Sequence, residues 1–393
     1  MIIGNDWFML ENRIRGKLAH QKKSGLYRNP FAIDLRKGKY LYVNGAKKIN
    51  FASNDYMGIA ASDDFRKKVS LNFQKFGTSS SSSRLVTANY TAMTEAENAF
   101  ADYFGYESCI FFPSGYQANI GILSSLFETG DTVFFDKHIH ASSVKGLLLS
   151  DANFKGYRHN STTHLKKRIE LLKTKNSDQS KKEVITVLTE SLFSMDGDFL
   201  DIDSLTQLRR EYSFFTIIDE AHAFGAVGDK GRGIARPVTD IAVGTFGKAL
   251  GLFGAFVLAP KWIKEYLFNF SSPIIYTTAL PEAHAASAMD LLKIIFNSDD
   301  KREKLSQVSQ WMKEGLLSEG FCVKGDAHII ALEIGDESKA VKLSRLLFDS
   351  GFLVFPARFP TVPLGKAIIR ISMNALLDKT DVKAFIKAIK SCT

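Results

Sequence analysis

The most constraining feature of this sequence is a lysine set between glycines, at Lys248 in the segment 245–251 (TFGKALG). The apolar run 241–244 directly before it is typical of a buried strand. Glycines let the backbone approach a bulky ligand closely. A lysine held away from water loses its proton more easily and becomes a nucleophile that can form a Schiff base with an aldehyde. The segment therefore predicts a reactive lysine at the end of a strand, although an isolated Gly-Lys pair would usually indicate a surface loop.

A second signal lies upstream, where Asp219 follows the strand-like run 214–218. An acid at the carboxyl end of a buried strand lies where open α/β sheets bind ligands. Pyridoxal phosphate (PLP) needs a lysine for its aldehyde, a carboxylate for its ring nitrogen and donors for its phosphate. Lys248 and Asp219 can supply the first two, and glycine-rich turns the third. The two segments together predict a PLP site.

These motifs resemble those of the α-oxoamine synthases, PLP enzymes that join an amino acid to an acyl thioester with loss of carbon dioxide. The resemblance extends from about Leu26 to about Leu376, and it is strongest to the 8-amino-7-oxononanoate synthases. It implies an α/β fold of fold type I (aspartate-aminotransferase-like), with a large, mostly parallel sheet domain and a small C-terminal α/β domain. The expected divisions are an N-terminal helix and hairpin arm (1–52), the large PLP-binding domain (53–285) and the small domain (286–393).

Composition sets the class of protein. The 393 residues are 45% hydrophobic and 24% charged, which is ordinary for a globular protein. The formal net charge is +9, but the basic residues are scattered and no nucleic-acid motif accompanies them, so we expect no nucleic-acid partner. A substrate that carries coenzyme A or an acidic acyl carrier protein fits this charge equally well.

Three observations indicate the cytoplasm. No apolar run is long enough to span a bilayer, so we expect no membrane association. The first residues lack the basic-then-apolar pattern of a secretion signal. The three cysteines show no metal spacing and no obvious pairing, which is typical of a reducing compartment.

The N-terminal region contains two predicted substrate contacts. An amphipathic helix is expected from Trp7 to about Lys23, and the Asn-Gly pair at 44–45 between strand-like runs predicts a hairpin. The resemblance implies that Arg28 contacts substrate, and an exposed arginine at a helix end is the alternative. The segment 53–58 (SNDYMG) resembles the family's SNDYLGL motif and implies that Asn54 lies near the substrate or the lysine, although it is also an ordinary turn.

A phosphate site is predicted where the strand-like run 108–112 leads into residues 113–119 (PSGYQAN). The first amides of a helix point at an anion, so a strand, a glycine turn and a helix together form a site for phosphate. We assign the backbone of Gly115 and Tyr116 to the PLP phosphate. A simple turn between strand and helix is the alternative.

The strand-like run 132–136 leads to the segment 138–142 (HIHAS). In the family, the histidine of the HAS triplet stacks on the pyridine ring, which implies this role, and that of a proton donor, for His140. The H-x-H spacing could indicate a metal, but no third ligand follows at a helpful spacing, so we expect none. Residues 159–161 (HNS) resemble the family's HND, with Ser161 in place of the acid.

Further PLP contacts follow from the resemblance. Residues 189–198 (TESLFSMDGD) match the family's TE-x-x-FSMDGD, which implies that Ser194 donates a hydrogen bond to the phenolic oxygen of PLP. His222 is expected to do the same from the other side, and Thr245 to reach the phosphate. Glu190 lies near the site and either helps to orient substrate or has no special role.

The segment 273–281 (PIIYTTALP) resembles one that enters the neighbouring subunit's site in this family. It implies a homodimer with shared active sites, in which Thr278 contributes a cofactor contact.

The C-terminal region contains two more predicted substrate contacts. Residues 359–365 (FPTVPLG) resemble the motif PPTVP-x-G, which implies a substrate contact for Thr361. Arg370 follows in a strand-like run. An arginine with two parallel donors suits the carboxylate of an amino acid, so we expect Arg370 to bind it. A salt bridge at a strand edge is the alternative.

The resemblance implies that Lys248 holds PLP and moves the α-proton, and that L-alanine condenses with a pimeloyl thioester to give 8-amino-7-oxononanoate in biotin synthesis. Two departures leave the acyl donor open: Ala88 replaces a family glycine and Met93 a family histidine. Glycine C-acetyltransferase, serine palmitoyltransferase, 5-aminolevulinate synthase and autoinducer synthase share the cofactor site and stay as alternatives. A non-catalytic relative that binds a partner through its basic surface is a further one. The sequence does not distinguish coenzyme A from acyl carrier protein.

Overall fold

The structure is a computed structural model that describes residues 5–175 and 183–393. The chain divides into two compact units. The first contains Met1–Ser53, Val308–Met373 and Leu377–Thr393, and the second contains Asn54–Gln307 and Asn374–Leu376. The chain passes from the second unit to the first within helix α11 (Asp299–Ser318).

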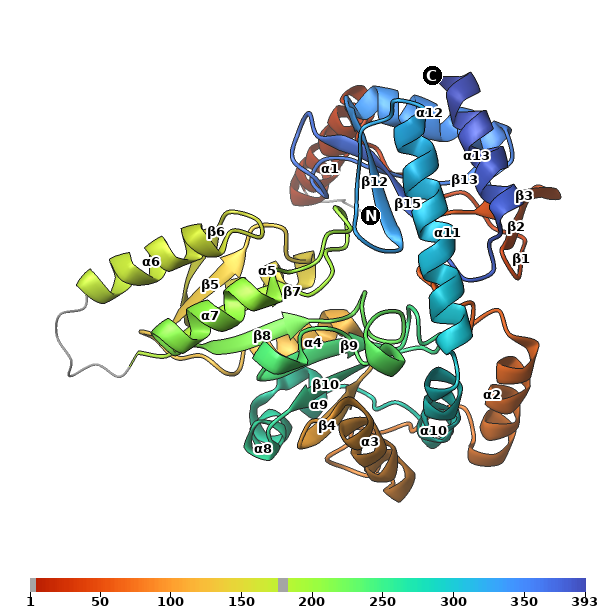
Figure 1. Cartoon of the computed structure of the whole chain (residues 1–393). Coiled ribbons are helices and arrows are strands. Elements are labelled where there is room, and N and C mark those ends of the chain that lie inside the picture. Colours follow the sequence, from red (N-terminus) through yellow and green to blue (C-terminus); the bar gives the residue numbers. More distant parts are fainter. Residues whose placement is uncertain (1–4, 176–182) are drawn as a thin grey trace. The chain divides into compact units, whose positions relative to one another are not determined.

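A seven-stranded sheet forms the centre of the second unit (Figure 1). Its strand order is β4-β10-β9-β8-β7-β5-β6. The run β9-β8-β7-β5-β6 is parallel, and β10 is antiparallel to both of its neighbours. The mostly parallel sheet that the sequence predicts is therefore confirmed. The strands are β4 (Ser108–Phe112), β5 (Thr132–Asp136), β6 (Asn153–Tyr157), β7 (Ile185–Glu190), β8 (Phe215–Asp219), β9 (Ile241–Thr245) and β10 (Ala255–Ala259).

Both faces of this sheet are buried because successive side chains of a strand point to opposite sides. On β8, Ile217 packs in the cluster that contains residues of α4 (Gly115–Leu123), α5 (Ala141–Leu148) and α8 (Lys261–Phe270). The next residue, Ile218, packs in the cluster of α6 (Thr162–Lys175) and α7 (Ile202–Tyr212) on the other face. Each such apolar side chain contributes about 1.5–3 kcal/mol on burial. Continuous apolar strands are what a sheet covered on both faces requires.

The parallel strands bring their carboxyl ends to one edge of the sheet. Asp136, Glu190, Asp219 and Thr245 are the last residues of β5, β7, β8 and β9. Since the ends of parallel strands lie together, these four polar residues gather at the edge where open α/β sheets bind ligands.

The rest of the second unit packs around this sheet. It contains the helices α2 (Asp63–Phe76), α3 (Thr91–Phe104), α9 (Ser272–Ile275) and α10 (Glu282–Phe296), and two short 3-10 turns at Asp229–Gly231 and Arg236–Val238. A buried ion cluster ties α3 to its surroundings, with Glu97 accepting from Arg84 (2.7 Å) and from Lys264 (2.8 Å).

The first unit contains two four-stranded sheets. One has the order β1-β2-β3-β13, in which β13 (Phe352–Leu353) runs parallel to β3. The predicted hairpin is confirmed, because Val43 pairs with Ala46 across Asn44 and Gly45, which both have positive φ. The other elements are α1 (Asn5–Lys23), β1 (Leu35–Lys37), β2 (Tyr40–Val43), β3 (Ala46–Asn50), β11 (Val323–Lys324), β12 (Ile329–Gly335), α12 (Glu337–Asp349), β14 (Phe355–Ala357), β15 (Ala367–Ser372) and α13 (Lys379–Cys392).

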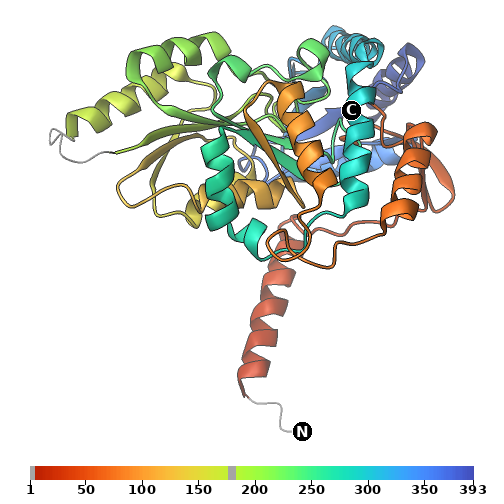
Figure 2. The same ribbon diagram turned by 90° about the horizontal axis from the view of Figure 1, so that it is seen from below.

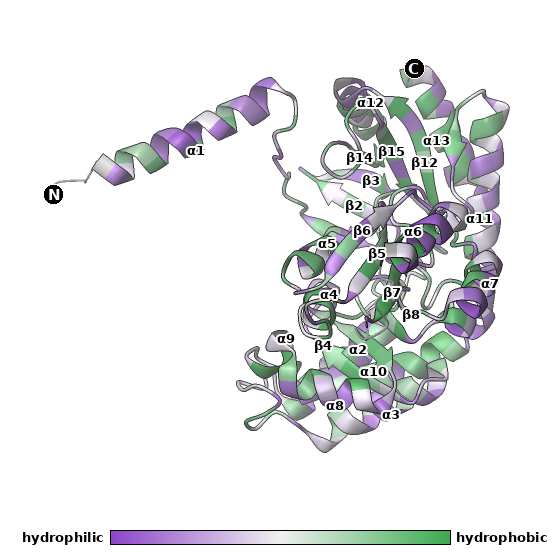
Figure 3. Cartoon of the chain, turned by 90° about the vertical axis from the view of Figure 1, so that its left-hand side faces the viewer, coloured by the Kyte–Doolittle hydropathy of each residue, from purple (hydrophilic) through white to green (hydrophobic). Residues whose placement is uncertain are grey.

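Helix α1 stands apart from the strands of its own unit (Figures 2 and 3). It carries hydrophobic and hydrophilic residues along its whole length (Figure 3). Trp7, Phe8 and Met9 are all exposed. Across residues 5–175 and 183–393, no helix combines the length and the apolar character needed to cross a membrane.

Candidate active site

A cavity of about 170 Å³ lies at the carboxyl edge of the seven-stranded sheet. All of the predicted cofactor-binding residues except Thr278 line it: Gly115, Tyr116, His140, Ser194, Asp219, His222, Thr245 and Lys248. The same cavity is also lined by Asn119, Ser142, Glu190, Ala221 and Val243. Segments that are up to 133 residues apart in sequence, from Gly115 to Lys248, therefore meet at one site.

Lys248 begins a chain of hydrogen bonds that runs away from the cavity. Its Nζ lies 2.7 Å from Nε2 of His222, and Nδ1 of His222 lies 2.7 Å from the hydroxyl of Tyr56. The Tyr56 hydroxyl donates to Oδ1 of Asn54 at 3.0 Å. Its single proton is then used, so its oxygen accepts from Nδ1–H of His222. Nε2 is left as the acceptor, and the amine of Lys248 donates to it.

A second network surrounds Asp219, which is buried. Asn119 donates from Nδ2 to Oδ2 of Asp219 (3.0 Å) and to Oγ of Ser142 (2.9 Å). The amide of Ala221 donates to the other carboxylate oxygen of Asp219 at 2.9 Å. Asn119 thus uses both of its amide hydrogens to fix the carboxylate at the end of β8.

The same network sets the tautomer of His140. Nδ1 of His140 accepts from the amide of Ser142 (3.3 Å), and the Ser142 hydroxyl lies 2.7 Å from the same nitrogen. Since Nδ1 is an acceptor, the ring proton of the neutral imidazole is on Nε2. Burial is the main cause that lowers the pKa of His140, and the charge of Lys248 acts in the same direction while Asp219 opposes it. A neutral imidazole with a proton on Nε2 suits a residue that stacks on a ring and donates a proton.

The N-terminus of α4 offers backbone amides to an anion. Ser114 caps this helix, and its Oγ accepts from the amide of Gln117 at 3.2 Å. A side chain at Gly115 would lie 4.0 Å from Cβ of Thr245, so the first turn of α4 and the end of β9 lie next to each other. The Thr245 hydroxyl donates to the carbonyl of Gly254 at 3.0 Å, and it must turn if it is to reach a phosphate.

Glu190 is a buried carboxyl group at the cavity wall. Its Oε2 accepts from the amide of Ser194 at 3.2 Å. Burial, with a further contribution from the charge of Asp219, raises the pKa of Glu190 to about 8. The group therefore holds a proton near neutral pH and can act as a hydrogen-bond donor beside Lys248.

The remaining predicted site residues lie elsewhere in the chain. Thr278 is exposed and does not line the cavity. Arg28 and Thr361 are exposed and Arg370 is buried, where its Nη1 donates to Oγ of Ser372 at 2.6 Å. These last three residues belong to the first unit. Their roles, and that of Thr278, stay predictions. Ala88 and Met93, the two positions that depart from the family pattern, are both fully buried.

The residues that line the cavity fit PLP. They supply an amine, a buried carboxylate for the ring nitrogen, a neutral imidazole and the open amides at the start of α4. Sequence reasoning missed Asn119, Ser142 and Tyr56. Asn119 lies four residues after Gly115, and this spacing places both on one face of a helix, which is a signal that could have found it.

Comparison with known proteins agrees with this geometry. Residues 46–389 match the family described as aminotransferase class I and II. The chain is 33% identical to 8-amino-7-oxononanoate synthase of Chlorobaculum parvum, over 97% of this chain and 99% of that protein. It is 32% identical to the enzyme of the same name from Thermoanaerobacter pseudethanolicus, over 96% of this chain and 95% of that one.

Solved structures show the same similarity. Serine palmitoyltransferase from S. paucimobilis, with bound PLP and myriocin, has a TM-score of 0.88 and 27% identity, with 96% of each chain covered. 8-Amino-7-oxononanoate synthase from Francisella tularensis has a TM-score of 0.74 and 29% identity, with 88% of this chain and 97% of that chain covered. The chain therefore belongs to the aminotransferase class I and II family of PLP-dependent enzymes, and within it to the α-oxoamine synthases.

Proposed function

We propose that this enzyme condenses L-alanine with a pimeloyl thioester, with loss of carbon dioxide, to give 8-amino-7-oxononanoate for biotin synthesis. The observation that carries the proposal is that Lys248, Asp219, His140 and His222 line the same cavity. The choice of substrates is supported by the names of relatives that match nearly the whole chain.

PLP, when bound, supplies an electron sink for the α-carbon of the amino acid. Asp219, oriented by Asn119, would keep the ring nitrogen protonated through a charge-assisted hydrogen bond, which is worth about 1.5–3 kcal/mol. The first amides of α4, at Gly115 and Tyr116, would hold the phosphate.

Lys248 is the proposed base for the α-proton. Its amine lies 2.7 Å from Nε2 of His222. This contact can hold Lys248 in place while the lysine carries the proton. His140, with its proton on Nε2, is the proposed ring-stacking residue and proton donor. Ser194 and His222 are proposed to donate hydrogen bonds to the phenolic oxygen, a role for which Nε2 of His222 must carry a proton in the PLP-loaded enzyme.

Four further residues are proposed to contact the substrates. Arg370 would bind the carboxylate of alanine through two parallel donors. Thr361, Arg28 and Asn54 are the other proposed substrate contacts. The thioester would come from coenzyme A or an acyl carrier protein, since both are acidic and the chain carries a formal net charge of +9.

We also propose a homodimer with shared active sites, to which Thr278 contributes. Tyr276 is 81% exposed and Phe253 is 69% exposed, and large exposed apolar side chains can mark a protein–protein interface. The segment that carries Tyr276 lies against residues 80–82, because Ala279 donates to the carbonyl of Ser82. A second copy that covers this surface would bury both rings.

Serine palmitoyltransferase activity is the second candidate, because the structure of that enzyme from S. paucimobilis superposes with a TM-score of 0.88. Met93 bears on this choice. It lies beside Arg84 and Phe111 at the wall of a small hollow, where the family carries a histidine.

The test is a matrix of substrates. Purified enzyme with PLP is assayed with alanine, glycine and serine against pimeloyl, acetyl and long-chain thioesters. Highest kcat/KM with alanine and a pimeloyl donor is expected, and Lys248→Ala is the inactive control. A higher kcat/KM with any other pair would overturn the substrate assignment.

A further inference from the structure

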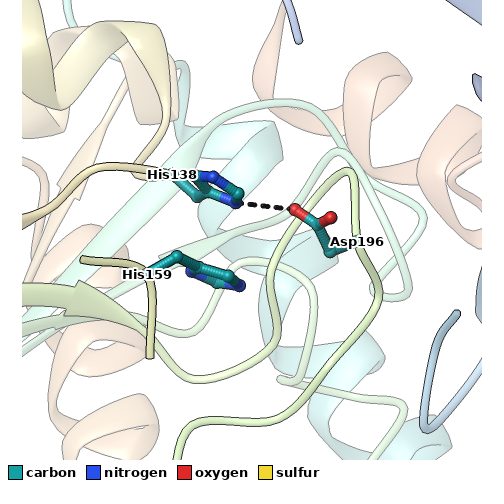
Figure 4. A group of neighbouring side chains, drawn as sticks. All are labelled: His138, His159 and Asp196. Carbon is teal, nitrogen blue, oxygen red and sulfur yellow. Dashed lines mark hydrogen bonds and ion pairs between the residues drawn. The ribbon is translucent and has the colours of Figure 1, made fainter. Parts of the chain in front are cut away.

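Five polar side chains form a cluster beside the cavity without lining it: Asp136, His138, His159, Asp196 and Asp198. The rings of His138 and His159 stack with centroids 3.9 Å apart and planes 12° apart. Asp196 lies 2.8 Å from Nδ1 of His138 (Figure 4). None of the roles assigned above uses these residues.

His159 is held at both ring nitrogens. Nδ1 lies 3.0 Å from Oδ1 of Asp136, and Nε2 lies 3.0 Å from Oδ2 of Asp198. Only a doubly protonated imidazole donates from both nitrogens at once. Burial lowers the pKa of His159, but the hydrogen bonds to the two carboxylates outweigh burial and raise that pKa to about 10. A charged imidazolium between two carboxylates is therefore the state that this geometry favours.

The cluster has three possible metal ligands within reach of one another, at His138, His159 and Asp196. The lone pairs of imidazole lie in the ring plane, so two nearly parallel, stacked rings do not direct them at one point. Both nitrogens of His159 already face carboxylates. The arrangement fits a structural link better than a metal centre.

Asp136 connects His159 to the turn that carries His140, which we call the histidine turn (residues 136–140). The amide of His138 donates to Oδ1 of Asp136 at 2.8 Å, and the amide of Ile139 donates to its carbonyl at 3.2 Å. These bonds close the histidine turn. The position of Asp136 therefore determines where His140 lies in the cavity wall.

Asp198 connects His159 to the turn that carries Ser194, which we call the serine turn (residues 193–198). The amide of Phe193 donates to the carbonyl of Asp198 at 3.1 Å and closes this turn. The rings of Phe193 and His159 are perpendicular to each other, with centroids 4.4 Å apart. The hydrogen bond of Asp196 to His138 joins the two turns a second time.

We infer that His159 is a positioning residue, which joins the histidine turn to the serine turn and thereby holds both His140 and Ser194 in the wall of the PLP site. This inference rests on the proposed function insofar as both residues contact the cofactor. His159 itself does not line the cavity.

The test uses His159→Phe, which keeps a flat ring for stacking but removes both hydrogen bonds. Cofactor-free protein is titrated with PLP, and its melting temperature is measured alongside. We expect the Kd for PLP to rise roughly tenfold, the scale of one lost charge-assisted hydrogen bond. The melting temperature of the cofactor-free variant should stay close to that of the cofactor-free wild type. The control is His164→Gln, which alters a half-buried histidine of α6 whose Nδ1 accepts from the amide of Arg158 outside this cluster, and it should leave the Kd unchanged.

His159→Gln keeps one of the two bonds and serves if His159→Phe does not fold; an increase in Kd smaller than tenfold is expected for it. A folded variant with the wild-type Kd, or loss of folding in both variants, would overturn the inference. The Kd for PLP does not depend on the substrate pair. Failure with alanine and a pimeloyl donor would therefore contradict the proposed function alone.

Discussion

The Nζ atom of Lys248 lies 2.7 Å from Nε2 of His222, and the other nitrogen of that ring is bound to the hydroxyl of Tyr56. A buried tyrosine thereby determines which nitrogen of His222 carries the proton. Tyr56 orients His222, although the two residues are 166 positions apart in the sequence. The amine of Lys248 is thereby coupled to a distant segment of the chain.

Tyr56→Phe removes this hydroxyl and keeps the buried ring. We expect kcat to fall roughly tenfold, because His222 loses the partner that fixes its tautomer and orientation. The melting temperature should stay close to that of the wild type. Tyr266→Phe is the matched control, since its hydroxyl donates to the carbonyl of Ser125 outside the cavity. Equal kcat for Tyr56→Phe and the wild type would contradict the assignment.

Asn119→Leu removes both hydrogen bonds of the side chain that holds Asp219 and Ser142. We expect the Kd for PLP to rise roughly tenfold to a hundredfold, because the carboxylate beside the ring nitrogen loses its orientation. Asn119→Asp should be worse at neutral pH, since a second carboxylate would repel Asp219.

Titration of the cofactor-free variants with PLP measures this effect. Asn72→Leu is the control, because Asn72 bonds to Ser287 and Asp290 away from the site. If Asn119→Leu bound PLP as tightly as this control, Asn119 would have no role in the cofactor site.

Glu190 predicts a pH dependence of stability. Burial, with a contribution from Asp219, raises its pKa from 4.5 to about 8 in the folded protein. Between these values the folded chain keeps a proton that the unfolded chain has released, so the free energy of unfolding decreases as the pH rises. Glu220, whose pKa burial raises to about 7, acts in the same direction.

We therefore expect cofactor-free protein to lose stability from about pH 5 to pH 8, and Glu190→Gln to lose less. Denaturant unfolding at several pH values measures both slopes. Glu211→Gln, at an exposed position, should keep the wild-type slope. Identical slopes for Glu190→Gln and the wild type would show that Glu190 keeps its ordinary pKa.

Glu97→Gln tests the ion cluster that ties α3 to its surroundings. Glu97 is fully buried and neutralises both Arg84 and Lys264, so removing its charge leaves two cations beside it. We expect a loss of about 3–5 kcal/mol in the free energy of unfolding. Glu211→Gln breaks an exposed pair with Lys166 and should cost less than about 1 kcal/mol. Similar losses for the two variants would contradict this reading of the cluster.

The sequence alone predicts the sheet and the chemistry at its strand ends. Apolar runs mark the strands because both faces of the sheet are buried. Asp219 is the last residue of β8, and Lys248 lies three residues after the end of β9. The hairpin at Asn44 and Gly45 is equally local, because two adjacent residues with positive φ determine it.

The supporting residues could not be predicted in this way. Asn119 bonds to Asp219 across 100 positions, and no periodicity in either segment carries that relationship. The Thr245 hydroxyl, expected at the phosphate, donates instead to a carbonyl nine residues away. These hydrogen-bond partners depend on which groups lie within reach once the chain has folded.

The most direct measurement is reduction of the PLP-loaded enzyme with borohydride, followed by peptide mapping. We predict that the cofactor is fixed to the peptide that contains Lys248 and that Lys248→Ala carries no label. A label on a different lysine, or a label that persists in Lys248→Ala, would contradict the account.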